Sequence, residues 1–127
     1  MSTTACSVVS DILDAIGIEY GFVTYAKKPI QYPYFVGEYT EYEPTTEDGM
    51  EESEFLLTGF TRDTWLSLEE AKNKIKKQFD PISGKRGITE DGGAIAVFYA
   101  GSRTVPTGDA DLKRIEITLK IKEWKVN

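Results

Sequence analysis

The chain has 127 residues, of which 40% are hydrophobic and 28% charged, and it carries a formal net charge of -6. This length and composition predict one folded domain, 1–127, whose negative charge argues against a general grip on nucleic-acid phosphates. The chain has no histidine, the commonest general acid/base and metal ligand, and no apolar run near the roughly 18 residues of a membrane helix.

The first segment predicts a short amphipathic helix that ends at Gly17. Its apolar residues recur at helical spacing: Val8, Val9, Ile12, Leu13 and Ile16. Cys6 has no second cysteine and no histidine to activate it, so we interpret it as a partly buried helix residue. Asp11 and Asp14 interrupt the apolar positions and no basic residue precedes them, which excludes a signal peptide and predicts a cytoplasmic protein.

Two strands are expected next, at 18–26 and 31–42, because both stretches are rich in aromatic and β-branched residues. Their short link at Pro29 predicts an antiparallel hairpin. The residues that follow, about 43–53, are acidic and contain turn signals, so we expect a flexible, solvated loop. A surface facing DNA or a partner is one alternative. A metal site is another, although the carboxylate spacing does not match a calcium loop.

Residues 54–61 predict a central strand, and a helix from Ser67 to Phe79 follows. Ser67 and Glu70 form a capping box at its start. One face of this helix is apolar, with Leu68, Ala71, Ile75 and Phe79. The opposite face carries the lysines Lys72, Lys74, Lys76 and Lys77. We expect the apolar face to pack on the sheet and the lysines to meet water.

The glycine-rich stretch 80–93 predicts a second flexible loop, and 94–100 predicts an interior strand followed by a loop over 101–111. Residues 113–122 alternate cleanly between apolar and polar side chains and predict a strand with one buried face. Because the apolar parity changes at Trp124, we expect a bulge or the end of regular pairing near that residue.

These elements predict an α+β fold with the order α-β-β-β-α-β-β. It is a mostly antiparallel sheet of about five strands, with the N-terminal helix and the central helix packed on one face. Three stretches then carry a resemblance: YPYFVGEY (32–39), FLLTGFTR (55–62) with the helix after it, and KRIEITLKIK (113–122). With them the chain resembles the tail terminator, or tail completion, proteins of long-tailed bacteriophages and prophages.

The resemblance implies a non-enzymatic structural protein that forms a ring, typically a hexamer, on the end of the tail tube. Its implied partners are other copies of itself, the tail tube protein and the head connector protein, with DNA passing through without specific binding. Members of this family are often monomers in isolation. The implied location is the bacterial cytoplasm during assembly and then the virion tail.

The resemblance implies that charged residues act in ring formation and DNA passage. An acidic surface facing the lumen or a partner would repel DNA phosphates, and its candidates are Glu41, Glu43, Glu47, Asp48, Glu51 and Glu52. Candidates for contacts between subunits are Lys74, Lys77, Lys85 and Arg86. We predict no catalytic residue, no cofactor and no metal site.

Two other functions stay open from the residues alone. The first is a small-molecule-binding module with an aromatic pocket formed by Tyr20, Phe22, Tyr32, Tyr34, Phe60 and Trp65. The second is a hydrolase that uses paired carboxylates of the acidic segment, such as Glu51 and Glu52, with a tyrosine or lysine partner.

Overall fold

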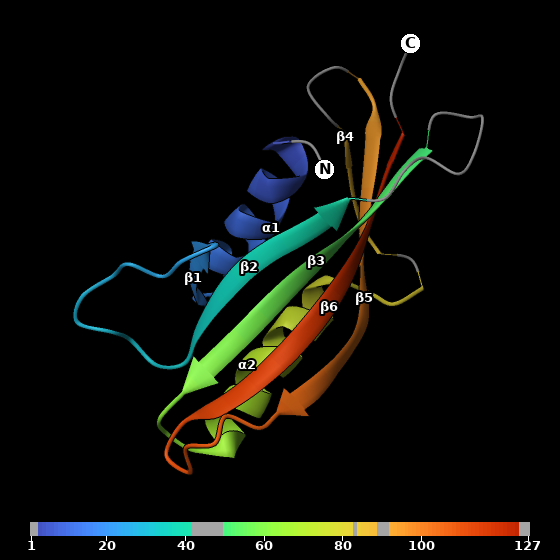
Figure 1. Ribbon diagram of the computed structural model, residues 1–127. Coiled ribbons are helices and arrows are strands. Elements are labelled where there is room, and N and C mark those ends of the chain that lie inside the picture. The colour runs from blue at the N-terminus through green and yellow to red at the C-terminus, as the bar shows by residue number, and fades with distance from the viewer. Residues whose placement is uncertain (1–2, 42–49, 83, 89–91, 125–127) are drawn as a thin grey trace.

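The predicted α+β fold, with two helices on one face of a sheet, is confirmed by the computed structural model, which describes residues 3–41, 50–82, 84–88 and 92–124 (Figure 1). The helices are α1 (Thr3–Ala15) and α2 (Trp65–Gln78). The strands are β1 (Glu19–Phe22), β2 (Tyr34–Glu41), β3 (Met50–Thr61), β4 (Lys85–Ile88), β5 (Ala94–Val105) and β6 (Lys113–Trp124). Neither described helix has the length and apolar character needed to cross a bilayer.

The sheet has the strand order β1-β2-β3-β6-β5-β4, so β3 and β6 form its centre. Four of its five pairings are antiparallel, and β1 pairs with β2 in parallel. The predicted hairpin between the first two strands is therefore wrong. β1 ends early because the chain turns back at Thr24, whose carbonyl oxygen lies where a side chain on Gly21 would be. The connection 23–33 then returns to the same end of the sheet before β2 begins.

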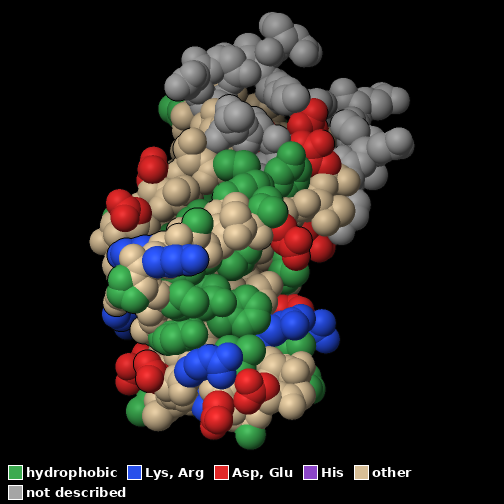
Figure 2. Space-filling view, turned by 60° about the vertical axis from the view of Figure 1, so that its left-hand side comes forward, with side chains coloured by type: hydrophobic (Ala, Val, Ile, Leu, Met, Phe, Trp, Pro, Cys, Tyr) green, Lys and Arg blue, Asp and Glu red, His purple; other side chains and the backbone are tan. Residues whose placement is uncertain are grey.

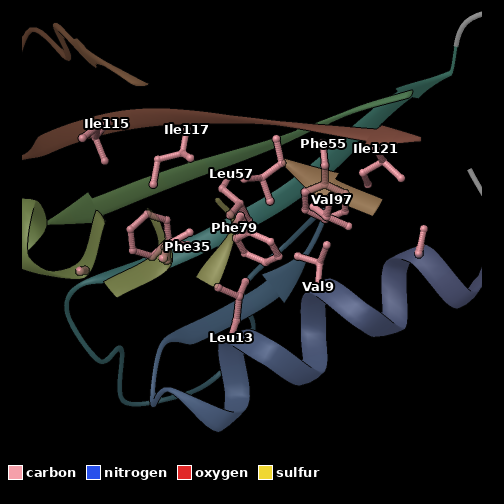
Figure 3. Packing of buried hydrophobic residues seen from close by; sticks show 14 of the residues in the cluster. Val9, Leu13, Phe35, Phe55, Leu57, Phe79, Val97, Ile115, Ile117 and Ile121 are labelled. Atoms are coloured by element: carbon pink, nitrogen blue, oxygen red, sulfur yellow. The ribbon is translucent and has the colours of Figure 1, made fainter. Parts of the chain in front are cut away.

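One apolar layer lies between the sheet and both helices. Alternate residues of β3 and β6 point inward, including Phe55, Leu57, Ile117 and Leu119, and all four are fully buried. Val9 and Leu13 of α1 point toward this layer from below, as Figure 3 shows. The predicted apolar face of α2 packs into the same core with Leu68, Ala71, Ile75 and Phe79. Burial of these side chains explains why both helices cover one face and leave the other open.

The start of α2 differs from the predicted capping box. Thr64 is the N-cap, and its hydroxyl oxygen accepts a hydrogen bond of 3.2 Å from the backbone N–H of Ser67. Ser67 therefore stands at the third helical position, where its own hydroxyl donates to the Thr64 carbonyl at 2.8 Å. Thr64 and Ser67 are both residue types that favour a helix N-cap. The helix starts about one turn earlier than predicted because Trp65 and Leu66 belong to its first turn.

The C-terminal strands also differ from expectation. β6 stays in register with β3 through Trp124, so no bulge interrupts it; of the two predicted alternatives, the end of the strand near Trp124 is the one observed. The inward row of β6 instead continues with Glu123, which is only 4% exposed. The bulge lies on β5, between Tyr99 and Gly101, and β5 continues to Val105 through residues predicted as a loop.

Two predicted loops contain strand residues. β3 begins at Met50, so 50–53 of the expected acidic loop are paired with β2 or β6, and Ser53 is buried. β4 lies within the glycine-rich stretch and pairs with β5 over four residues. The remainder of the acidic stretch, 42–49, lies outside the described residues.

Candidate functional site

The face of the sheet opposite the helices carries an open groove of about 440 Å³. The outward residues of β2, β3 and β6 reach it from the sheet, and the connection after β1 closes one side. Its lining combines aromatic, aliphatic and charged side chains: Val23, Thr24, Tyr25, Tyr34, Val36, Glu38, Thr58, Phe60 and Arg114. This mixture provides apolar contact area together with a few charges that give orientation.

A cluster of contacting aromatic rings lies at one wall of the groove. Tyr34 lies at the centre, with its ring centroid 4.5 Å from Tyr25, 5.4 Å from Phe60 and 5.8 Å from Tyr32. Burial raises the pKa of Tyr34, which favours its neutral hydroxyl over the tyrosinate. These ring contacts hold the connection 23–33 against the sheet, because Tyr25 and Tyr32 both belong to that segment.

A carboxylate held by two arginines lies beside the groove. Glu116 accepts hydrogen bonds from Arg103 at 2.9 Å and from Arg114 at 3.2 Å. Burial opposes ionisation of this carboxyl, but the two guanidinium groups outweigh it, so the pKa of Glu116 lies below its ordinary value. The Nε atom of Arg114 is buried without a hydrogen-bond partner. Glu116 therefore links β5 to β6 on the open face and fixes the direction of Arg114.

The acidic candidates do not share one segment. Glu41 ends β2, and Glu51 and Glu52 lie within β3, while Glu43, Glu47 and Asp48 lie outside the described residues. Neighbouring residues of a strand point to opposite faces. Glu51 is therefore on the helix side, opposite Glu123, and Glu52 is on the open face, 3.8 Å from Lys122.

This alternation bears on the hydrolase alternative, because Glu51 and Glu52 cannot act together on one substrate from opposite faces of the sheet. Among the described residues, no three acidic or cysteine side chains gather closely enough to hold a metal ion. Cys6 is partly buried, as predicted, and burial raises the pKa of its thiol, which disfavours the nucleophilic thiolate.

The basic candidates form two separate surfaces. Lys74 and Lys77 are exposed on α2, as the predicted lysine face requires. Lys85 and Arg86 are exposed on β4, at the end of the sheet. Between these surfaces, Lys76 lies over the ring of Tyr99, 5.3 Å from its centroid. The lysine face of α2 and the edge at β4 and β5 thus belong to one side of the molecule.

The opposite side carries exposed hydrophobic residues. Figure 2, which brings β1 and β2 forward, shows apolar side chains gathered in the middle of the view with charged groups around them. The exposed apolar residues of β1, β2 and their connection are Phe22, Val23, Ile30 and Tyr39. Phe22 stacks on Tyr39 with 6.0 Å between ring centroids. Surfaces of this kind are typical of sites that contact another protein.

Three of the six aromatic residues considered for a pocket are brought together: Tyr34 and Phe60 line the groove, and Tyr32 contacts Tyr34. Phe22 and Tyr20 belong to the helix side, and Trp65 lies at the start of α2. The residues that sequence reasoning missed here are Tyr25 and Arg114. The alternation of apolar and polar residues in β6 could have predicted that Arg114 lies on the open face. The turn of the chain that places Tyr25 on Tyr34 has no local sequence signal.

Comparison with known proteins gives a likeness of fold. No family model matches the chain, and no curated protein matches it either. A solved structure described as "Virion of native gene transfer agent (GTA) particle" contains a chain that superposes with a TM-score of 0.64 at 10% sequence identity. The superposition covers 89% of this chain and 84% of that one. The similarity of fold thus extends over most of both chains.

Proposed function

We propose that the protein is a structural virion component of the tail terminator type, which forms a ring that caps a tail tube and joins it to the head connector. The observation that carries this proposal is the fold shared with a chain of a gene transfer agent virion over 89% of the sequence. The resemblance of the strand and helix stretches to tail terminator proteins supports the same role. In this role the protein acts through shape and charge and is not an enzyme.

The charged residues acquire specific tasks in such a ring. We assign the acidic residues around the end of β2 and the start of β3 to the opening, where they repel DNA phosphates and let DNA pass. These are Glu41, Glu43, Glu47, Asp48, Glu51 and Glu52. The lysine face of α2 and the basic residues of β4 would contact the acidic surface of a neighbouring subunit. These are Lys74, Lys77, Lys85 and Arg86.

The proposal is tested by adding the protein to purified tail tubes encoded in the same genome and imaging them by negative stain. We expect a ring of subunits at one end of each tube and tubes of fixed length when the protein is present during polymerisation. Tubes that grow without limit and carry no terminal density would contradict the role. A monomer in the absence of tubes would not, because the tube end supplies the template.

A second candidate, a small-molecule-binding module, is favoured by the groove beside Tyr34, whose volume falls within the range of ligand sites. A thermal-shift screen of metabolites tests it. A hit that disappears in Arg114→Ala but remains in Lys74→Ala would support binding in the groove. A flat response across the screen would count against this candidate.

A further inference from the structure

Both outermost strands of the sheet are shorter than the strands they pair with. β1 covers β2 only from Tyr34 to Gly37, and β4 covers β5 only from Ala94 to Val97. Among the described residues, no strand covers the outer edge of β2 after Gly37 or that of β5 after its bulge. These edges lie on opposite sides of the sheet, and Figure 1 shows no element beside the outer edge of the lower part of β5.

The backbone groups on these edges point away from the sheet. The carbonyl of Gly37 accepts from the Val23 N–H at 2.8 Å, and the N–H of Tyr99 donates to the Phe79 carbonyl at 3.2 Å. In both strands, the residues whose side chains face the core therefore direct their backbone N–H and C=O groups toward the outer edge of the sheet. The same geometry applies to Tyr39 on β2. Outward backbone groups on an uncovered edge are a template for pairing with another strand.

On β5 the alternation resumes after the bulge. Ser102 and Thr104 are in register with Ile117 and Ile115 of β6, whose side chains face the core. Ser102 and Thr104 therefore also direct their backbone N–H and C=O groups toward the outer edge of the sheet. Both residues are exposed. No proline or lysine protects this edge before Pro106.

We propose that β5 of one copy pairs with β2 of a second copy, so that the sheet continues from subunit to subunit. The direction of the strands fits this arrangement. β2 is antiparallel to β3, β3 to β6 and β6 to β5, so β2 and β5 run in opposite directions. A second copy placed in the same orientation then adds its β2 to β5 as an antiparallel neighbour, which needs no crossover.

The strand ends define the register. Val105 ends β5, and β1 stops beside Gly37 on the partner edge. Pairing Thr104 with Tyr39 sets Val105 opposite Glu38, which uses the open part of both edges and avoids β1. Shifting the strands by two residues in one direction would place Thr104 against the end of β1. Shifting them the other way would leave Tyr39 beside Pro106, which has no N–H to donate.

Charge and apolar surface support a second copy as the occupant. In this register Arg103, whose side chain is 73% exposed, lies diagonally across from Glu38 of the second copy on the open face. On the helix side, Glu41 of the second copy approaches the region where Lys76 covers Tyr99. The exposed stack of Phe22 and Tyr39 would be covered by the same contact.

Because the two edges are different surfaces, each copy presents one to its predecessor and the other to its successor. Such a heterologous contact closes into a ring or extends into a filament. This inference rests on the proposed function, which expects a closed ring. It identifies β5 and β2 as the strands that join neighbouring subunits in that ring.

Disulfide trapping tests the pairing directly. The double variant Tyr39→Cys with Thr104→Cys, made in a Cys6→Ala background, places two cysteines on a directly opposed antiparallel pair, where Cα atoms lie about 5.5 Å apart and a disulfide fits. After mild oxidation in the presence of tubes we expect a ladder of covalent multimers that reductant collapses to monomer. The control pair Tyr39→Cys with Lys120→Cys should give no ladder, because Lys120 lies on the open face of β6 away from both edges.

A proline variant tests the edge without crosslinking. Thr104→Pro removes an outward N–H that the subunit's own sheet does not use, so circular dichroism should stay native while ring formation on tubes falls at least tenfold. Thr104→Ala keeps the N–H and should assemble normally.

The outcomes separate the two proposals. A wild-type protein that caps tubes while the cysteine pair gives no ladder overturns the strand pairing and leaves the proposed function intact. A ladder in a protein that never caps tubes supports the pairing and overturns the proposed function. A native-like Thr104→Pro protein that assembles as wild type also overturns the pairing.

Discussion

A glycine in the centre of the sheet offers a quantitative test of how the core is packed. Gly59 on β3 lies directly opposite Phe35 on β2, and the Phe35 ring lies over the glycine backbone. A Cβ added at Gly59 would come within 2.4 Å of Phe35 Cε2 and 2.7 Å of Cζ. Since Phe35 is fully buried, its ring has no free space to enter. Gly59→Ala should therefore destabilise the protein even though alanine is the better residue for a regular strand.

The size of the effect follows from two opposing contributions. The ring must move by about 1 Å to restore an ordinary carbon contact, and overpacking of this kind costs about 1–3 kcal/mol. Replacing glycine returns about 0.5–1 kcal/mol of backbone entropy. We expect a net loss of about 1–2 kcal/mol in the free energy of unfolding, or a melting temperature lower by about 3–10 °C in a domain of this size. Urea unfolding followed by circular dichroism measures it.

Two further variants make the test specific to the contact. Gly87→Ala on β4 meets only Ile95 Cγ2 at 3.4 Å, so it should stay within about 0.5 kcal/mol of wild type. Phe35→Leu removes the ring, and in that background the cost of Gly59→Ala should fall to nearly zero. A neutral Gly59→Ala, or costs that simply add in the double variant, would refute the packing argument.

Three other predictions concern a cap and two ionisable groups. Thr64→Ala removes the acceptor at the start of α2 and should cost about 1 kcal/mol in urea unfolding, with a smaller loss for Ser67→Ala, which keeps that acceptor. Because the pKa of Glu116 is lowered in the folded state from 4.5, its contribution to stability is present above that value and lost as the pH falls below it. Glu116→Gln should flatten the fall in stability under acid, and an unchanged pH profile would contradict the role of the arginine contacts. Burial raises the pKa of Tyr20 from 10.0 to about 12, so stability should decline as the pH rises through this window. Tyr20→Phe should remove both that decline and the last tyrosinate absorbance to appear in an ultraviolet titration.

The core was predictable wherever one face of an element is wholly apolar. The row from Ile115 to Ile121 and the stripe of α2 meet in the observed core as expected. The position of Glu123 at the end of this buried row could not be predicted, because a glutamate at a core-facing position carries no apolar signal. The parallel pairing of β1 depends on the turn at Thr24, whose close approach to Gly21 has no local sequence signal.

The candidate site was less accessible than the fold. Alternation in β6 places Arg114 and Glu116 on the open face, so their side of the sheet could be read from the sequence. The groove itself needs the stacking of Tyr25 on Tyr34, a contact between the connection and a strand. The open edges depend on how many residues β1 and β4 pair, and strand ends are set by tertiary contacts rather than by residue type.

The central pairing of β3 with β6 has a consequence for how the protein is made. Paired residues in this seam lie roughly 50 to 75 positions apart in the sequence, a separation that slows closure of the sheet. Until β6 leaves the ribosome, β3 lacks one neighbour and β5 has no central strand to join. Truncation before Lys113 should therefore yield an aggregation-prone chain rather than a smaller domain. Nascent chains would thus reach an assembly-competent state only after β6 has left the ribosome, which delays self-association until the sheet is complete.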